Sequence, residues 1–373
     1  MELHKEIAFI RNLLLLLVGI AGLMILKNLS GILLPLVLAL LLSVIYLPVV
    51  LYLEGKRIPR KLIVTFIAVL TLGLVYTVAN IFITTINEII SQSEFLLGQL
   101  TGKFILLAES VARIPYLDLE PDMETVQRIL NQVLNPDVIT AAASSILKGA
   151  GSFGSSFLMF TLYFLFLLPG LSHYKSYLQY VGGRNVSILD DYEIMQNNIS
   201  TYMGIKTIIS LCTGTIAGLV CWMLGLKFPF FWGFMSFVLN FIPSIGSIIA
   251  TLLPTLMGLV QFETFKEVFF LMMLLGVNQM LIGNVIDPRI MGNRLRLNTV
   301  TVLFGLVFWG VIWGVPGMLM SVPLMVTLKL ILEKSETWSI IARIMGYPEK
   351  QSRPAGPKRG RRKPRQKDGN GTD

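Results

Sequence analysis

The sequence predicts an all-α polytopic membrane protein with about six full-length spans, two broken re-entrant helical hairpins and an amphipathic helical region. Three observations predict this class. The 373-residue chain is 54% hydrophobic and only 14% charged, whereas soluble chains are about 25% charged. The charged residues cluster between long apolar runs. Several of these runs reach the roughly 18 residues needed to cross ~30 Å of hydrocarbon.

Six apolar runs are expected to form the full spans. The first is retained rather than cleaved as a signal peptide, because no small-residue cleavage site follows it and the next run starts at once. Pro35 lies in the first turn of the second run, where its missing N–H costs little. The polar residues 169–202 are expected to form a loop with a short helix around 190–200. The six runs are 12–26, 32–53, 62–86, 149–168, 202–226 and 268–286.

Two further apolar stretches are long and interrupted. Residues 230–260 are broken at 240–246, and residues 299–332 are broken at 314–317 and again at Pro323. Non-helical backbone at membrane depth is tolerated only where protein or a watery cavity satisfies it. Each stretch is therefore either a kinked full span or a hairpin that dips into the membrane. The length of both stretches favours hairpins, which would enter from opposite sides.

Basic residues indicate the orientation, because Lys and Arg favour cytoplasmic loops. They gather in residues 1–11, 54–61, 169–202 and 287–298 and after residue 328. Both termini are therefore predicted to be cytoplasmic. The net charge of +9 follows from this topology, so no nucleic-acid partner is expected.

The chain is expected to divide into four parts. Residues 1–86 hold the first three spans, and residues 87–150 form an extracytoplasmic amphipathic region with a one-sided helix at 122–134. Residues 151–332 form the transport core, which contains both broken stretches. Residues 333–373 form a basic, disordered cytoplasmic tail that could contact anionic lipid.

Candidate transport residues are the polar and helix-breaking side chains of the core. At a helix break, free carbonyls and half-helix ends can face a substrate or ion. Gln279 shares a helix face with two glycines, which indicates either a polar wall of the pathway or a close helix–helix seam. The predicted substrate pathway contains Asn240, Pro243, Ser244, Gly246, Ser247, Pro254, Asn278, Gln279, Asn284, Gly314, Pro316, Gly317 and Pro323.

Lys206, Asp287 and Arg289 are candidates for charge relay or gating, because ionisable residues near membrane spans tend to be functional. Two interpretations remain open for the first two. Lys206 and Asp287 could each pair inside the helix bundle. Alternatively, Lys206 reaches from the start of its span to the surface, and Asp287 caps a loop beside Pro288 or pairs with Arg289. Their positions near the ends of apolar runs favour the second interpretation.

Several motifs in the C-terminal half carry a family resemblance. They are the residues 240–246, Pro254, Gln279, 283–292, 297–298 and 314–324. In this order the motifs resemble the autoinducer-2 exporter family, also called PerM-like permeases, and the earlier spans fall in the family's order too. The resemblance implies a multi-pass permease that exports small solutes or exchanges cations for protons. It also implies a homo-oligomer, with a pentamer as one candidate.

The sequence departs from the family pattern at two positions. Family members often carry an acidic residue just before the position of Asn284, and this chain has none there. That departure weakens an ion-coupled mechanism. Asn298-Thr299 also stands where the family often has His-Pro, which affects the shape of a loop.

We therefore predict a transporter of the prokaryotic cytoplasmic (inner) membrane that exports small organic solutes, autoinducer-2-like, by alternating access. The alternative within the transporter class is Na⁺(Li⁺)/H⁺ antiport, and outside it a membrane scaffold or passive pore. An enzyme is not expected, because His4 and His173 lie outside the apolar runs and no HExxH motif occurs. The expected partners are the lipid bilayer, a small solute or cation and further copies of the chain. No metal, cofactor or catalytic residue is expected.

Overall fold

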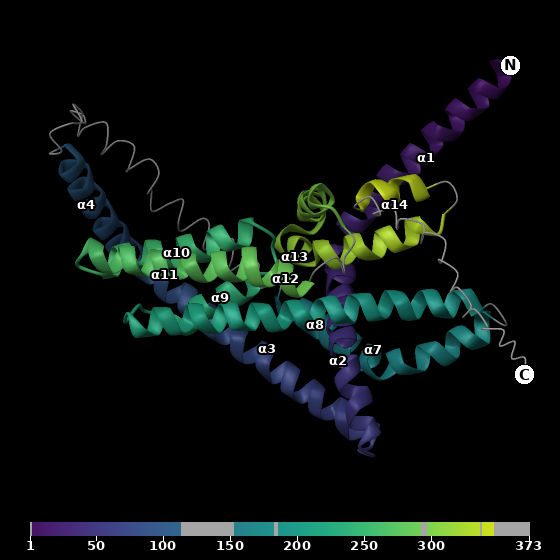
Figure 1. Ribbon diagram of the computed structural model, residues 1–373, viewed down its shortest axis with the longest axis horizontal. Helices are drawn as coiled ribbons and strands as arrows, with labels where there is room; N and C mark the ends of the chain where they lie inside the picture. The colour runs from purple at the N-terminus through teal and green to yellow at the C-terminus, as the bar shows by residue number, and fades with distance from the viewer. Residues whose placement is uncertain (1, 113–152, 183–185, 292–296, 336–337, 347–373) are drawn as a thin grey trace, which may run out of the picture.

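The computed structural model describes residues 2–112, 153–182, 186–291, 297–335 and 338–346, and these contain helices and no strand (Figure 1). The all-α prediction is confirmed for this part of the chain. The predicted helix at 122–134 lies outside it, and so does the tail from residue 347 on. The prediction that 333–373 is disordered is wrong for Ser339–Met345, which form a helix whose Ala342 and Met345 are buried against the rest of the protein. The elements are α1 (Glu2–Asn28), α2 (Ser30–Gly55), α3 (Arg60–Ser91), α4 (Ser93–Ala112), α7 (Phe153–Gly182), α8 (Val186–Met223), α9 (Pro229–Leu239), α10 (Ile245–Gln261), α11 (Phe265–Leu281), the π-helix η1 (Ile282–Ile286), α12 (Asp287–Met291), α13 (Thr299–Glu333) and α14 (Ser339–Met345).

Five segments of the described chain are long and apolar enough to cross a membrane. They are 30–55, 60–91, 196–223, 265–291 and 299–333. Shorter apolar helices occur at 17–28, 95–106, 154–170, 229–239 and 245–261. By length and composition, the described chain therefore contains several helices suited to cross a membrane, while the number of six full spans stays a prediction.

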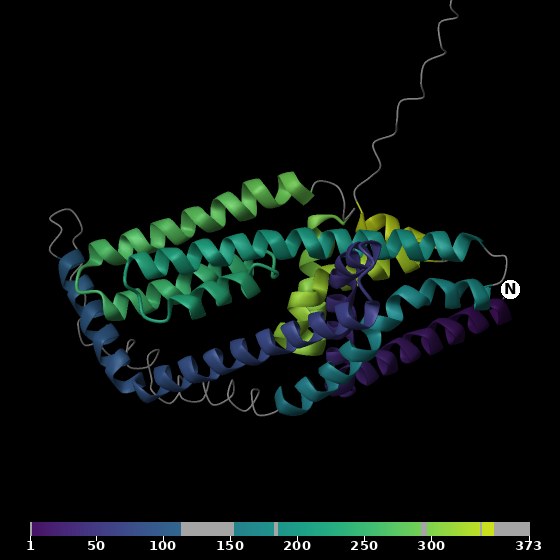
Figure 2. The same ribbon diagram turned by 90° about the horizontal axis from the view of Figure 1, so that it is seen from below.

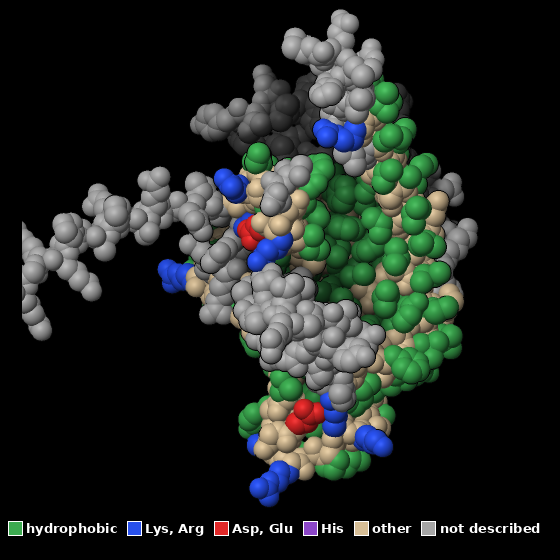
Figure 3. Space-filling view, turned by 90° about the vertical axis from the view of Figure 1, so that its right-hand side faces the viewer, with side chains coloured by type: hydrophobic (Ala, Val, Ile, Leu, Met, Phe, Trp, Pro, Cys, Tyr) green, Lys and Arg blue, Asp and Glu red, His purple; other side chains and the backbone are tan. Residues whose placement is uncertain are grey.

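Helices α8, α9, α10 and α11 lie side by side along the long axis of the molecule (Figures 1 and 2). Glycines let α8 and α9 approach closely, because a Cβ on Gly233 would lie only 2.8 Å from the main-chain oxygen of Gly214. A separate apolar core joins α2, α8 and α13 through residues such as Leu47, Tyr202 and Trp313. Seen from one end, hydrophobic side chains cover much of the described surface, as lipid contact requires (Figure 3).

The predicted polar loop at 169–202 is wrong. Helix α7 continues through Pro169 to Gly182, and α8 already begins at Val186. Proline removes one backbone donor, and a helix tolerates this loss where neighbouring groups hydrogen-bond to the local backbone. Arg60, at the start of α3, donates to the main-chain oxygen of Pro169 and so ties this part of α7 to α3.

The predicted break at 240–246 is present, and the stretch around it folds as a helical hairpin. At the open end, the Gln261 side chain joins the two arms: its Oε1 accepts from the Lys227 N–H at 2.7 Å, and its Nε2 donates to the Gly225 oxygen at 2.7 Å. At the closed end, a Cβ on Gly246 would lie 1.8 Å from the Leu239 oxygen. The placement of this hairpin relative to the membrane stays a prediction.

Residues 299–333 also fold back on themselves. Gly314 has φ 66° and ψ −147°, a conformation that essentially only glycine adopts. The two halves then pack together, because a Cβ on Gly305 would lie 2.4 Å from Met325 Cγ. The second break expected at Pro323 is wrong: the helix continues through this buried proline. A single missing donor is not enough to end a helix that is packed on its neighbours.

We expect Gly314→Ala to destabilise the protein by about 1–3 kcal/mol, the usual cost of forcing an L-residue into a rare backbone conformation. No atom lies within 4 Å of the added Cβ, so the effect would come from the backbone alone. Thermal unfolding in detergent measures it. The control is Gly73→Ala, at an open helical position, which should unfold at or above the wild-type temperature. Equal stability of wild type and Gly314→Ala would contradict the need for this turn.

Candidate functional site

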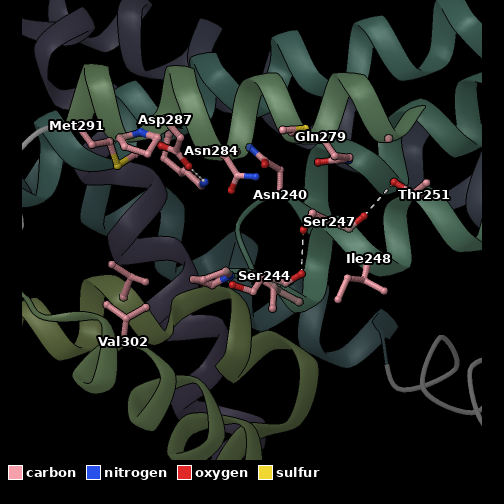
Figure 4. Close-up of a pocket in the computed structure, with 18 of the residues that line it drawn as sticks. Asn240, Ser244, Ser247, Ile248, Thr251, Gln279, Asn284, Asp287, Met291 and Val302 are labelled. Atoms are coloured by element: carbon pink, nitrogen blue, oxygen red, sulfur yellow. Dashed lines mark hydrogen bonds and ion pairs between the residues drawn. The ribbon is translucent and has the colours of Figure 1, made fainter. Parts of the chain in front are cut away.

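A cavity of ≈ 690 Å³ lies where the tip of the α9–α10 hairpin faces α8, α13 and the segment from α11 to α12 (Figure 4). Its polar side chains come from three separate stretches of the chain, 202–206, 240–255 and 279–287, and α13 adds Val302 and Val322. The predicted site residues that line it are Lys206, Asn240, Pro243, Ser244, Ser247, Gln279, Asn284 and Asp287.

The hairpin tip is held in a tight turn at Ser244. This residue has φ 61° and ψ −53°, and the Ile245 N–H donates to the Pro243 oxygen at 2.7 Å. That bond, two residues apart, defines a γ-turn of the rare, strained kind. Strained backbone of this type clusters at functional sites. The turn places Pro243 and Ser244 in the cavity wall.

Hydroxyl groups of α10 form one wall of the cavity, and each donates its proton to its own helix. Ser247 donates to the Ser244 oxygen at 2.8 Å and Thr251 to the Ser247 oxygen at 3.1 Å (Figure 4). Thr255 donates to the Thr251 oxygen at 2.7 Å. A hydroxyl has one proton and two lone pairs. Because these protons are used locally, the oxygens offer lone pairs to a ligand.

The facing wall is the helix that carries Gln279, Asn284 and Asp287 (Figure 4). Its π-helical turn, Ile282–Ile286, separates Gln279 from Asp287, and such turns are frequent at functional sites. The sequence predicted a loop from Asp287 onward, and this is wrong, since α12 runs from Asp287 to Met291. Pro288 is tolerated because a π-turn disturbs the ordinary hydrogen-bond pattern beside it.

Lys206 and Asp287 form an ion pair across the cavity. Lys206 Nζ lies 2.6 Å from Asp287 Oδ2, and the two side chains are 8% and 18% exposed. The interpretation that Lys206 reaches the surface is wrong, because the residue is only 6% exposed and its ammonium pairs with Asp287. Asp287 is a helix residue and does not cap a loop. Pairing inside the bundle, the other interpretation, is what the structure contains.

Two buried oxygens on residues that line this cavity have no hydrogen-bond partner among the described residues, namely Asp287 Oδ1 and Gln279 Oε1. Buried polar atoms are rarely left unpaired. Leaving such an atom without a partner costs about 1–3 kcal/mol. Both oxygens are acceptors, so only a group that donates a hydrogen bond would satisfy them.

Other predicted pathway residues lie away from the cavity. Asn278 is buried and donates to the Thr213 oxygen of α8 at 3.1 Å. Of the two interpretations of this helix face, the helix–helix seam therefore describes Asn278, and the polar wall describes Gln279. Arg289 is exposed. The predicted residues outside the cavity lining are Gly246, Pro254, Asn278, Arg289, Gly314, Pro316, Gly317 and Pro323.

The structure adds lining residues that sequence reasoning missed. Thr251 and Thr255 had a usable signal, because Ser244, Ser247, Thr251 and Thr255 recur at the spacing of one helix face. Apolar and aromatic lining residues had no such signal, because their types are also common in the core. The missed residues include Tyr202, Thr251, Thr255, Met272, Met280 and Met291.

Comparison with known proteins places the chain in a family. A sequence model described as AI-2E family transporter matches residues 13–337. The chain belongs to the AI-2E transporter family. The resemblance recognised in its motifs is thereby confirmed, and so is its class as a membrane transporter or permease.

Relatives in this family cover nearly the whole chain. The putative transport protein YhhT of Escherichia coli K12 is 28% identical over 87% of this chain and 90% of its own length. The AI-2 transport protein TqsA of the same organism is 28% identical over 86% and 91%. A putative transport protein of Haemophilus influenzae is 28% identical over 94% and 98%. These bacterial relatives and the apolar helices indicate a multi-pass inner-membrane protein.

Proposed function

We propose that this AI-2E family transporter exports small, uncharged organic solutes that carry several hydrogen-bond donors, and that it does so by alternating access around the cavity. The observation that carries the proposal is the set of unpaired acceptors, Gln279 Oε1 and Asp287 Oδ1, opposite the hydroxyl wall of α10. Solutes of the autoinducer-2 type fit this description. The name of TqsA, an AI-2 transport protein, supports the same substrate class.

The net charge of the cavity lining supports an uncharged solute, and the cavity volume supports a small one. The Lys206 ammonium pairs with the Asp287 carboxylate, so the two ionic groups of the lining sum to zero. Moving a full ionic charge from water into a protein cavity without a counter-charge carries a large desolvation cost. A donor-bearing neutral solute pairs the free oxygens without that cost. The cavity volume of ≈ 690 Å³ lies within the roughly 300–1,000 Å³ of small-molecule sites.

Alternating access is supported by the two helical hairpins. The cavity contains residues of both, Ser244 and Ser247 from the first and Val302 and Val322 from the second. Hairpins that enter from opposite faces could each close the cavity on one side, as broken helices do in other transporters. The homo-oligomeric state and the cytoplasmic position of both termini belong to this proposal as well.

The sidedness of the first hairpin is testable by labelling. With Cys212→Ser to remove the exposed cysteine, we expect Lys227→Cys and Thr264→Cys to react with a membrane-impermeant thiol reagent from the same side. The reason is that Gln261 joins the two arms near these positions. Labelling from opposite sides would show that 230–260 is a kinked full span.

Transport itself is testable in proteoliposomes with a labelled autoinducer-2-type solute. We expect Gln279→Met, which removes the free acceptor at similar volume, to lower solute flux about five- to tenfold. That change corresponds to the ~1–1.4 kcal/mol of one lost hydrogen bond. The matched control is Thr207→Val, whose hydroxyl bonds to the Met203 oxygen outside the cavity lining. Unchanged flux in Gln279→Met would contradict a substrate contact at this oxygen.

Sodium/proton antiport is the second candidate, and the Asp287 carboxylate in the cavity favours it. Proton movement driven by sodium without solute flux would support antiport, with Asp287 and then Glu88 as the first residues to replace. The absence of both fluxes would favour a scaffold or passive pore. Solute flux that Gln279→Met reduces would support the exporter.

A further inference from the structure

Asn298 joins the start of α13 to the end of α14. Its Oδ1 accepts from the Thr301 N–H at 2.8 Å and so caps α13. Its Nδ2 donates to the oxygens of Ile344 at 2.6 Å and Gly346 at 3.2 Å, and its own N–H donates to the Met345 oxygen at 2.9 Å. One residue thus pairs orphan groups at two helix ends. The C-terminal helix is held firmly against the second hairpin.

Helix α14 has one buried face and one exposed apolar face. Ala342 and Met345 are buried, and Met345 packs into the core that joins α2, α8 and α13. On the opposite side, Ile340 is 64% and Ile344 is 69% exposed. Exposing these two isoleucine side chains to water is unfavourable. They suit a helix that lies in the interfacial layer of a bilayer.

The surroundings of α14 place it at the level of lipid head groups. The apolar segment 299–333 ends just before it, and the ion pair of Lys329 with Glu333 lies in that last turn. Trp338, directly before α14, is 47% exposed, and tryptophan favours the membrane–water interface. Arg343 is exposed on α14 itself.

Strong positive charge follows α14 in the sequence. Residues 347–373 contain nine Lys and Arg against three Asp and Glu. Basic residues close to an anionic membrane surface each contribute about 1 kcal/mol of attraction. Apolar insertion combined with a polybasic segment is the combination that gives stable binding to an anionic surface. The positive charge therefore favours an anionic bilayer surface as the partner of the exposed apolar face of α14.

We propose that α14 docks on an anionic bilayer surface, drawn there by the positive charge that follows it in the sequence, and that this docking supports one wall of the transport cavity. The coupling runs through Asn298. The Val302 N–H donates to the main-chain oxygen of Asn298 at 3.1 Å, and Val302 lines the cavity. Lipid contact at α14 thereby holds the first turn of α13 in place. The lipid contact does not depend on the proposed function, whereas its effect on transport does.

The lipid contact is tested with the full chain in vesicles of phosphatidylcholine, with and without phosphatidylglycerol, using brominated lipids as fluorescence quenchers. The difference between wild type and Trp338→Phe gives the emission of Trp338. We expect brominated phosphatidylglycerol to quench it more than brominated phosphatidylcholine. This preference should disappear at high salt and on changing Lys358, Arg359, Arg361, Arg362, Lys363 and Arg365 to Gln. The matched control is Trp222, 68% exposed on α8, which should show no preference.

The outcomes distinguish an anionic bilayer from a second copy of the chain and from nucleic acid. Equal quenching of Trp338 by both lipids would overturn the proposal. So would loss of quenching by both lipids together with cross-linking of Ile344→Cys between copies, because a second copy would then cover this face. Binding of an oligonucleotide in place of the phosphatidylglycerol preference would assign the charge to nucleic acid and would also overturn it.

The coupling is tested by solute flux. Wild-type flux should rise when phosphatidylglycerol is added. Asn298→Ala should keep the quenching preference and lose this dependence of flux on lipid. Flux that responds to phosphatidylglycerol equally in wild type and Asn298→Ala would overturn the coupling. If wild type shows no flux in any lipid while the quenching preference persists, the proposed function fails and the lipid contact stands.

Discussion

Replacing Gly246 by alanine is expected to abolish transport and to destabilise the protein by about 1–3 kcal/mol or more, the range for overpacked cores. The added Cβ would lie 1.8 Å from the Leu239 oxygen and 3.2 Å from Ile242 Cβ. The Leu239 oxygen belongs to the backbone, so no side-chain rotation can relieve the clash. The two arms of the hairpin would have to separate, and the turn at Ser244 would move with them.

The measurement compares Gly246→Ala with Gly276→Ala. Gly276 lines the facing wall of the same cavity, and no atom lies within 4 Å of a Cβ built there. We expect Gly276→Ala to keep its unfolding temperature and most of its solute flux. If Gly246→Ala unfolded at the wild-type temperature and transported normally, the close approach of α9 and α10 would play no part in the mechanism.

The breaks in the chain could be predicted from sequence, but their type could not. Pro243 and Gly246 marked a real turn, and 314–317 marked another. Pro169 and Pro323 were expected to end helices, yet both lie inside continuous helices. The difference is physical. A proline removes one hydrogen bond, which neighbouring groups can replace, whereas Gly314 adopts a backbone conformation that reverses the chain.

The position of Lys206 shows a second limit. The sequence places it near the start of a span because the apolar run begins at residue 202. Hydropathy marks where a helix becomes apolar, and the helix itself starts 16 residues earlier at Val186. The polar turns before residue 202 stay helical and pack on neighbours: the Ser200 hydroxyl, for example, donates to the Val44 oxygen at 3.2 Å. This packing depends on contacts far apart in the sequence.

The sequence predicted many of the residues of the candidate site, but it did not predict the directions in which their side chains point. Asn278 and Gln279 are adjacent and chemically alike, yet one seals a seam with α8 and the other faces the cavity. Neighbouring helix positions point about 100° apart, so the rotation of the helix decides their roles. The π-turn at 282–286 then sets the direction of Asp287. Nothing in the local sequence predicts that π-turn.

Removing one partner of the Lys206–Asp287 pair is expected to cost about 3–5 kcal/mol, because the remaining charge is left buried without compensation. Asp287→Asn and Lys206→Met should each lower the unfolding free energy by this amount. The double variant should cost clearly less than the sum of the two, since removing both charges leaves no buried ion. Equilibrium unfolding in detergent, analysed as a double-mutant cycle, measures the coupling.

Arg289→Gln is the matched control for this cycle. Arg289 is charged and lies two residues from Asp287, but it is exposed and outside the cavity lining. We expect it to change the unfolding free energy by less than about 0.5 kcal/mol, as surface substitutions do.

Additive effects of the Lys206 and Asp287 variants would mean that the two groups do not interact in the folded protein. A large coupling together with normal solute flux in the double variant would give the pair a structural role. A large coupling with lost flux in a double variant that stays folded would place the pair in the transport step.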